Sequence, residues 1–263
     1  MRIKLNNILT FVSLGLTALL LILVVRAWYA VNKTANVESG VGATAVGKNL
    51  YISSTYNGGD TFIYDESTFN STWKTEADLT ISNILIPAST VDATNYYYTN
   101  DINEYGTAIQ TDGNFKFNLI TTSKSYYYAE KTVYLCTSEE VDMNCCLRNI
   151  SIEKGIDETD IYKSVRVAFK YSTNTKIFRG NVDTCYPAVS TTAVSNTDPS
   201  LQSGGQANGT FSFPIVGAET VDDVTTYTVT AVSVLIWVEG QDPNAIATYA
   251  GTGFKVNMSF QTY

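Results

Sequence analysis

Histidine is absent from this 263-residue chain. Its absence excludes the Ser-His and Cys-His nucleophile systems and His-ligated catalytic zinc, and it removes the commonest general base near neutral pH. A hydrolase would have to use a carboxylate pair, a Ser-Lys system or an oxygen-ligated metal. No complete catalytic set of these kinds is recognisable, so we expect a protein that is not an enzyme and needs no cofactor.

Charge is also scarce. Charged residues make up 16% of the chain, and Asp and Glu (25) outnumber Lys and Arg (17), which gives a net charge of -8. Phosphate binding needs clustered Lys and Arg, so this balance argues against a nucleic-acid partner. The remaining composition, rich in Thr, Ser, Asn and Tyr, favours strands and turns over long surface helices.

The one long apolar run, residues 8–25, lies near the amino terminus and follows basic residues. A basic flank, an apolar stretch and then small residues are typical of an export signal, and Ala27 ends a candidate cleavage site. We expect residues 1–27 to be a signal peptide, or a membrane anchor if they are not cleaved. Residues 28–263 are then expected to be extracellular, secreted or attached to the cell surface, and only residues 8–25 would enter a membrane.

Four cysteines, Cys136, Cys145, Cys146 and Cys185, follow this segment. An even number in an exported chain favours disulfides, and four cysteines allow three pairings. Adjacent cysteines rarely pair with each other, because the ring that they would close is strained. We therefore expect Cys185 to pair with one of the other three, and the remaining two to close a local loop. A tetrathiolate zinc site is the alternative, but no CxxC spacing supports it.

Alternation of apolar and polar residues predicts strands along most of the chain. In residues 164–171, for example, Val165 and Val167 share an apolar face, whereas Ser164 and Arg166 share a polar one. Further predicted strands are residues 79–86, 115–119, 126–136, 177–179, 211–215, 227–238 and 254–260.

Strands with one apolar face must bury it against a second layer. We therefore expect residues 28–263 to form a single all-β domain, a two-layer antiparallel β-sandwich of the jelly-roll or immunoglobulin-like kind, preceded by an N-terminal hydrophobic helix. A barrel is the alternative architecture.

Residues 28–56 are expected to form an extended amino-terminal arm of this domain. They contain small residues and several glycines, and they alternate only weakly until Leu50 and Ile52. Such a segment has little side-chain area to bury, so it would gain chiefly from main-chain hydrogen bonds at a sheet edge. That edge belongs either to a neighbouring subunit or to the arm's own domain.

An acidic segment directly follows the apolar residues 232–238, which predict a strand covered on both faces. Gly240 breaks the apolar run and Pro243 forbids an inner strand, so we interpret this segment as a strand exit. Its acids, Glu239 and Asp242, are weak candidates for calcium ligands, because two carboxylates without further oxygen donors make a poor site. We expect no metal ion here.

Two tyrosine triplets are candidate ligand contacts: Tyr96, Tyr97 and Tyr98, and Tyr126, Tyr127 and Tyr128. Aromatic rings cover the faces of sugars, so a glycan contact is one hypothesis. The alternative is structural, because tyrosine favours strands, and three in a row place two rings on one face and one on the other.

Four segments also carry a resemblance to a known family: "RAWYAVNKTANVES" after the apolar run, "NILIPASTVDATNYYYTN", "DIYKSVRVAF" and "VLIWVEGQDPN". They resemble secreted Gram-positive cell-surface proteins similar to the TasA and camelysin biofilm-fibre family. The resemblance implies an extracellular β-sandwich subunit that polymerises by lending its amino-terminal strand to a neighbour. This chain is longer than the fibre subunits and carries cysteines that they lack, and no histidine is present to support the proteolysis linked to the family.

These observations lead to three functional hypotheses. The first is an exported structural or assembly protein of the cell surface, a filament or biofilm-matrix subunit that binds copies of itself or other surface proteins. The second is a carbohydrate- or host-binding adhesin, which needs the tyrosine triplets exposed on one concave face. The third and weakest is a carboxylate-dependent hydrolase, which needs two acids facing each other across a cleft at about 5–10 Å.

Overall fold

The computed structural model describes the following residues: 39–46, 49–90, 92–98, 118–121, 126–179, 201–203, 205–206, 211–240, 242, 244–245 and 252–263. All of them belong to one unit, Val37–Tyr263. The predicted signal peptide (residues 1–27), its hydrophobic helix and Cys185 lie outside the described residues. Within the described ranges, no helix has the length and apolar character needed to cross a membrane.

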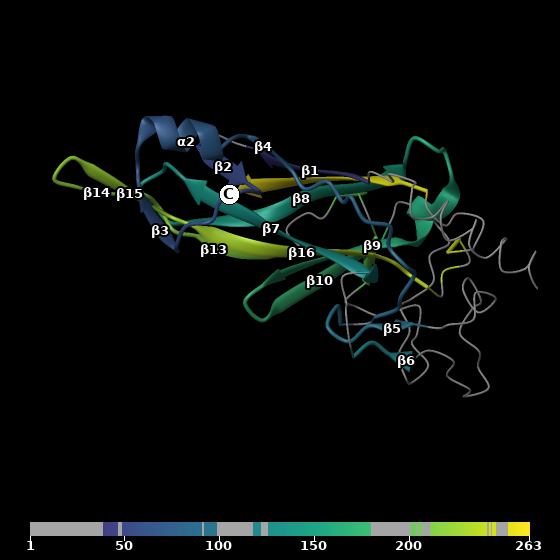
Figure 1. Ribbon diagram of the computed structural model, residues 1–263. Helices are drawn as coiled ribbons and strands as arrows, with labels where there is room; N and C mark the ends of the chain where they lie inside the picture. The colour runs from purple at the N-terminus through teal and green to yellow at the C-terminus, as the bar shows by residue number, and fades with distance from the viewer. Residues whose placement is uncertain are drawn as a thin grey trace, which may run out of the picture. The chain divides into compact units, whose positions relative to one another are not determined.

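Two six-stranded sheets make up most of the fold (Figure 1). The first has the order β12-β8-β17-β1-β4, with β13 also pairing with β8, and the second has the order β11-β10-β9-β16-β7-β2. Neighbouring strands are antiparallel except in the pairs β1–β17 and β10–β11. The prediction of an all-β fold with antiparallel sheets is therefore confirmed.

The strands of the first sheet are β1 (Gly40–Val46), β4 (Glu76–Asp78), β8 (Met143–Lys154), β12 (Gly205–Gln206), β13 (Ser212–Ile215) and β17 (Phe254–Thr262). Those of the second are β2 (Leu50–Ser53), β7 (Tyr128–Thr137), β9 (Val165–Tyr171), β10 (Asn174–Arg179), β11 (Leu201–Ser203) and β16 (Thr230–Val238). Of the predicted strands, residues 79–86 are wrong, because β4 ends before them and only Ile81 makes a bridge, to Ser39.

The main core lies between the two sheets, where alternate residues of each strand point inward. Leu147 and Phe260 come from the first sheet and Phe169 and Val234 from the second, and all four are fully buried. Burying one such side chain contributes about 1.5–3 kcal/mol. The period-two pattern of β9 and β17 predicted these inward positions correctly.

Single segments join the two sheets along both of their long sides. On one side, the backbone of Lys74 pairs with Ile52 of the second sheet, and β4 directly afterwards pairs with β1 of the first. On the other side, β11 pairs with β10, and β12 and β13 then pair with β8. Strands that change sheets in this way cover edges that would otherwise be open to association.

The outer face of the second sheet is covered at one end by an aromatic layer. Helix α2 (Glu66–Thr72) and a three-stranded sheet pack there, and that sheet has the order β14 (Glu219–Val221), β15 (Val224–Thr228) and β3 (Thr61–Ile63). Phe62 stacks on Trp73 and on Tyr227, each with ring centroids 5.3 Å apart. Asp65 caps the helix by accepting a hydrogen bond from the Thr68 amide. Two turns of helix are too short to show a periodic pattern, which is why the sequence did not predict it.

The other end of that outer face is covered by residues 88–90 and 92–98, and by a small sheet of β5 (Tyr97–Tyr98) and β6 (Asn118–Leu119). A 3-10 helix, η3 (Asp160–Ser164), leads into β9. Because these segments cover the outer face of the second sheet, the first half of β9 is buried on both faces. The prediction that Ser164 and Arg166 lie on a polar, solvated face is therefore wrong, because both are fully buried.

The expected amino-terminal arm is also corrected within the described residues. Strand β1 lies between β17 and β4, and β2 pairs with β7 of the second sheet. Val41, Ala43 and Ala45 are buried in the core together with Leu50 and Ile52. The side chains of β1 are thus small because little space is available between the sheets, and not because the strand is unburied. Residues 28–38 lie outside the described part.

The predicted local disulfide is wrong, because any pairing within residues 136–146 other than that of the adjacent cysteines needs Cys136 or Cys145; the predicted bond to Cys185 lies outside the described residues. Cys136 and Cys145 are free thiols, and both are buried. Cys145 points into the main core from β8, whereas Cys136 points from β7 into the aromatic layer on the other side of the second sheet. The region predicted as a stapled loop is the end of β7 and the start of β8. Burial raises the pKa of both thiols well above the usual range.

We expect the thiols of Cys136 and Cys145 to resist alkylation in the native protein, because burial disfavours the reactive thiolate. Iodoacetamide at pH 8 should leave both unmodified until a denaturant is added, as read by mass spectrometry of peptides. Reductant should leave the protection of these two thiols unchanged. A disulfide-linked peptide containing either residue would contradict this expectation.

Candidate functional site

The most unusual chemistry in the described residues lies where β16 ends. The strand finishes at Val238, as the sequence predicted, and Ala88 pairs with the chain just beyond it. The Ala88 amide donates to the Val238 carbonyl (2.9 Å), and the Gly240 amide donates to the Ala88 carbonyl (3.0 Å). The Glu239 amide donates to the Ser164 carbonyl (2.7 Å). The strand exit is therefore bonded to two separate segments.

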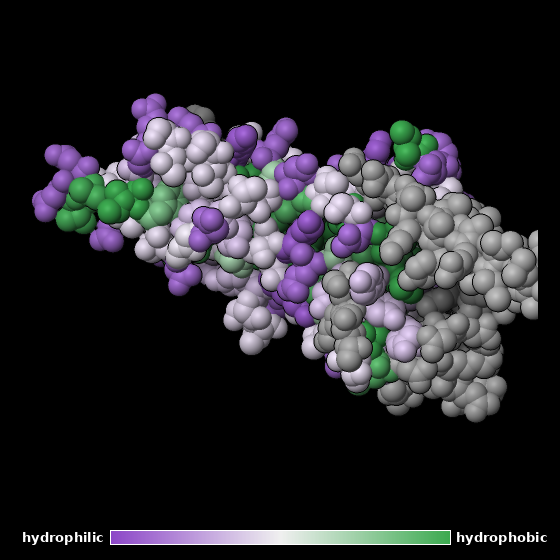
Figure 2. Space-filling model, in the orientation of Figure 1, coloured by the Kyte–Doolittle hydropathy of each residue, from purple (hydrophilic) through white to green (hydrophobic). Residues whose placement is uncertain are grey.

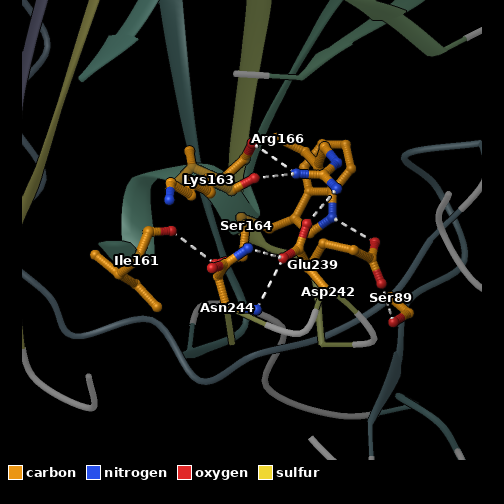
Figure 3. Close-up of polar contacts among 10 residues, drawn as sticks. Ser89, Ile161, Lys163, Ser164, Arg166, Glu239, Asp242 and Asn244 are labelled. Carbon is orange, nitrogen blue, oxygen red and sulfur yellow. Dashed lines mark hydrogen bonds and ion pairs between the residues drawn. The ribbon is translucent and has the colours of Figure 1, made fainter. Parts of the chain in front are cut away.

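An ion pair between Arg166 and Asp242 is buried at this exit (Figure 3). Arg166 Nη2 lies 3.0 Å from Asp242 Oδ2, and both side chains are fully buried. Arg166 Nη1 also donates to the carbonyls of Lys163 (3.0 Å) and Val165 (3.1 Å). The second carboxylate oxygen of Asp242 accepts from the amide (2.9 Å) and side chain (2.8 Å) of Asn244. A buried ion pair needs such additional hydrogen bonds, because desolvation of both charges is costly.

Glu239 is fully buried beside this pair but makes different contacts. The hydroxyl of Ser89 donates to one carboxylate oxygen, and Trp237 Nε1 donates to the other at 3.4 Å. Ser89 is itself paired through its backbone with Tyr97. Glu239 therefore attaches residues 88–97 to the sheet.

The two candidate calcium ligands, Glu239 and Asp242, are thus occupied by separate internal partners. Across the described ranges, no group of three or more His, Cys, Asp or Glu side chains is placed to hold a metal ion. Sequence reasoning missed Arg166 and Ser89. The available signal was an arginine within the apolar run "VRVAF", since a charge at such a position needs a buried partner.

Four tyrosines of the two triplets pack against other aromatic rings in this region. Tyr96 is only 1% exposed, stacks on Tyr128 (centroids 4.4 Å apart) and meets Trp237 edge-on (5.7 Å). Tyr98 packs against Tyr127 at 5.2 Å. Burial raises the pKa of the Tyr96 phenol well above its usual range.

Two further tyrosines differ in exposure: Tyr97 is half-buried in β5, and Tyr126 is 59% exposed. Because Tyr96 is buried and stacks on the half-buried Tyr128, the triplets do not present a shared platform of fully exposed rings to a ligand.

The turn that precedes the first triplet is held by Asp92. Its carboxylate accepts from the amides of Thr94 and Asn95, each at 2.8 Å. Burial raises the pKa of Asp92, but these hydrogen bonds outweigh it and the pKa is lowered overall. Lys170 Nζ donates to the Ala93 carbonyl at 2.6 Å. The turn is thereby attached to β9, so the described residues between 88 and 98 are held to the second sheet at several points.

Replacing Tyr96 with Phe should raise the free energy of unfolding by about 1 kcal/mol. Within the described residues the Tyr96 hydroxyl is buried without a hydrogen-bond partner, and such a group costs roughly 1–3 kcal/mol. Urea denaturation measures the change. Tyr126→Phe is the matched control and should have little effect. A clear loss of stability in Tyr96→Phe would show that the hydroxyl has a partner.

No protein-family model, curated protein or solved structure matches this chain. Its role must therefore be inferred from the geometry. The residues around Arg166 are directed at one another, and the network joins β9, the exit of β16 and residues 88–98. Such an arrangement stabilises one conformation of the fold.

Proposed function

We propose that the protein is an exported structural or assembly protein of the cell surface, a filament or biofilm-matrix subunit, rather than an enzyme. In this proposal residues 1–27 direct export, and subunits join by exchanging an amino-terminal strand. The closely packed core between the two sheets and the scarcity of charge suit a durable extracellular building block. The adhesin hypothesis has less support, because Tyr96 is buried and four of the other five tyrosines are half-buried.

Strand β1 is the observation that carries the proposal. All seven of its residues pair with β17, from Gly40 opposite Lys255 to Val46 opposite Gln261. Its contacts come from the backbone ladder and from Val41, Ala43 and Ala45, and every one of them would be recreated by β1 of a neighbouring copy. An exchange of identical elements therefore loses few contacts, which is why it is a low-cost route to assembly.

A cysteine pair across β1 and β17 tests the exchange directly. Gly42 and Asn257 are register partners, and a Cβ at Gly42 would lie 3.6 Å from Asn257 Oδ1. Gly42→Cys with Asn257→Cys, made in a Cys146→Ser, Cys185→Ser background, should form a disulfide after mild oxidation. If β1 is exchanged, non-reducing electrophoresis will show a ladder of linked chains, and electron microscopy of the unoxidised protein will show filaments.

The matched control is Glu153→Cys with Lys255→Cys, a register pair between β8 and β17. Neither strand is exchanged in the proposal, so this pair should link only within one chain. Monomeric crosslinks from both pairs at high protein concentration, together with no filaments, would refute strand exchange.

A further inference from the structure

The sheet formed by β14, β15 and β3 has an apolar face directed away from the aromatic layer. Phe62 and Tyr227 point inward, whereas Ile63, Val221 and Val224 are 67%, 56% and 46% exposed. The register places Val221 opposite Val224 and places Thr226 opposite both Glu219 and Ile63. We call the exposed side chains Ile63, Val221 and Val224 the outer apolar face. Figure 2 shows apolar surface on this hairpin, bordered by hydrophilic residues.

The edges of this sheet also offer backbone N–H and C=O groups for pairing with a further strand. In the described part of the chain, β14 and β3 each pair only with β15, and every residue of β14 is exposed. This differs from the two large sheets, whose long sides are closed by segments that change sheets. Asp222 and Asp223 turn the hairpin with positive φ values of 50° and 62°, and the stacked rings beneath hold the sheet in place.

The chain segments that form and flank this sheet contain many acidic residues and few basic ones. No Lys or Arg occurs in residues 49–73, 132–147 or 180–254. The acidic side chains at this end of the fold are Asp60, Asp65, Glu66, Glu139, Glu140, Asp142, Glu219, Asp222 and Asp223. The loop that carries Glu139 and Asp142 is bonded to Gly217 and Ala218, just before β14. Lys74, after α2, is the nearest basic residue along the chain.

We propose that the outer apolar face and the free edge of β14 bind an extended, basic polypeptide segment of another protein. The open edge supplies main-chain hydrogen bonds for an added strand, as in β-augmentation. The outer apolar face receives alternate apolar side chains, and the acids attract Lys or Arg between them. A second copy of the same face would bring like charges together, so the acids disfavour self-pairing while they favour a cationic strand.

Fluorescence anisotropy of the full-length protein with a labelled peptide of about ten alternating Lys and Val residues tests the proposal. Binding should be saturable and should weaken as salt is raised from about 50 mM to about 500 mM, because exposed charge pairs are screened. Glu219→Gln, Asp222→Asn and Asp223→Asn combined should weaken binding about tenfold, the effect of three exposed ion pairs. Asn tolerates positive φ, so the turn is retained.

Ile63→Thr with Val224→Thr should weaken binding to a similar degree while β-propensity is kept. The matched controls are Glu153→Gln and Ile156→Thr, which alter exposed residues at and beyond the end of β8 and should bind the peptide normally. Equal binding of a Glu-Val peptide, unchanged binding by the triple variant, or oligomerisation through this face without peptide would each overturn the proposal.

Discussion

Replacing Arg166 with Met is expected to lower the free energy of unfolding by about 3–5 kcal/mol, enough to unfold much of a marginally stable domain. Met fills much of the same volume, so the loss is chiefly electrostatic. It leaves the Asp242 carboxylate buried without its cation, and it leaves the carbonyls of Lys163 and Val165 without the guanidinium. Urea denaturation followed by circular dichroism measures the effect.

Two variants separate the ion pair from its surroundings. Arg148, on β8, is exposed, so Arg148→Met should change stability by less than about 0.5 kcal/mol. Adding Asp242→Asn to Arg166→Met should restore part of the lost stability, because the uncompensated charge is removed while the amide oxygen still accepts from Asn244. If the double variant is as unstable as the sum of its single changes, the charges are not coupled.

Replacing Ala43 with Lys is expected to destabilise the protein by about 4 kcal/mol or more, because the new ammonium would be buried between the sheets without a partner. Ala43 is 1% exposed and belongs to the main core, where it lies opposite Met258 and Ala77. Thermal and urea unfolding measure the loss. The same change one residue later, Thr44→Lys, provides the matched control.

Thr44 points to the opposite face of β1 and lies beside Glu76 of β4. A lysine there would face solvent next to a carboxylate, so stability should change little. If Ala43→Lys were tolerated as well as Thr44→Lys, β1 would be a loosely held arm and not a core strand. The comparison therefore tests the correction made to the amino-terminal segment.

The regular strands could be predicted from sequence because their burial follows local alternation. The period of two in residues 254–260 and the apolar run at residues 232–238 correspond to β17 and β16. The alternation pattern gave the wrong burial for Arg166, because β9 is covered on both faces there. A buried polar residue needs a partner, and the local pattern contains no information about that partner. The pattern also failed to identify β1 as a core strand, because its small side chains differ little in hydrophobicity between the two faces of the strand.

The candidate site could be predicted only in part. Glu239 and Asp242 were recognised as a strand exit from Gly240 and Pro243, but Arg166 and Ser89 lie 76 and 150 positions away from their acidic partners. Local spacing carries no information about such contacts. The cysteines show the same limit, since an even count indicated disulfides while the strands direct two of the thiols into separate clusters.

By itself, the sequence determined the composition of the protein and the predominance of strands in its backbone. The lack of histidine and the excess of acids are properties of composition, and the strands are properties of short-range alternation. Only the tertiary structure decided that Tyr96 is buried, that Arg166 pairs with Asp242, and that the thiols of Cys136 and Cys145 are apart. These outcomes depend on which segments cover the outer face of the second sheet. Packing between residues that are far apart in the chain decides which segments cover this face, and local sequence patterns contain no information about such packing.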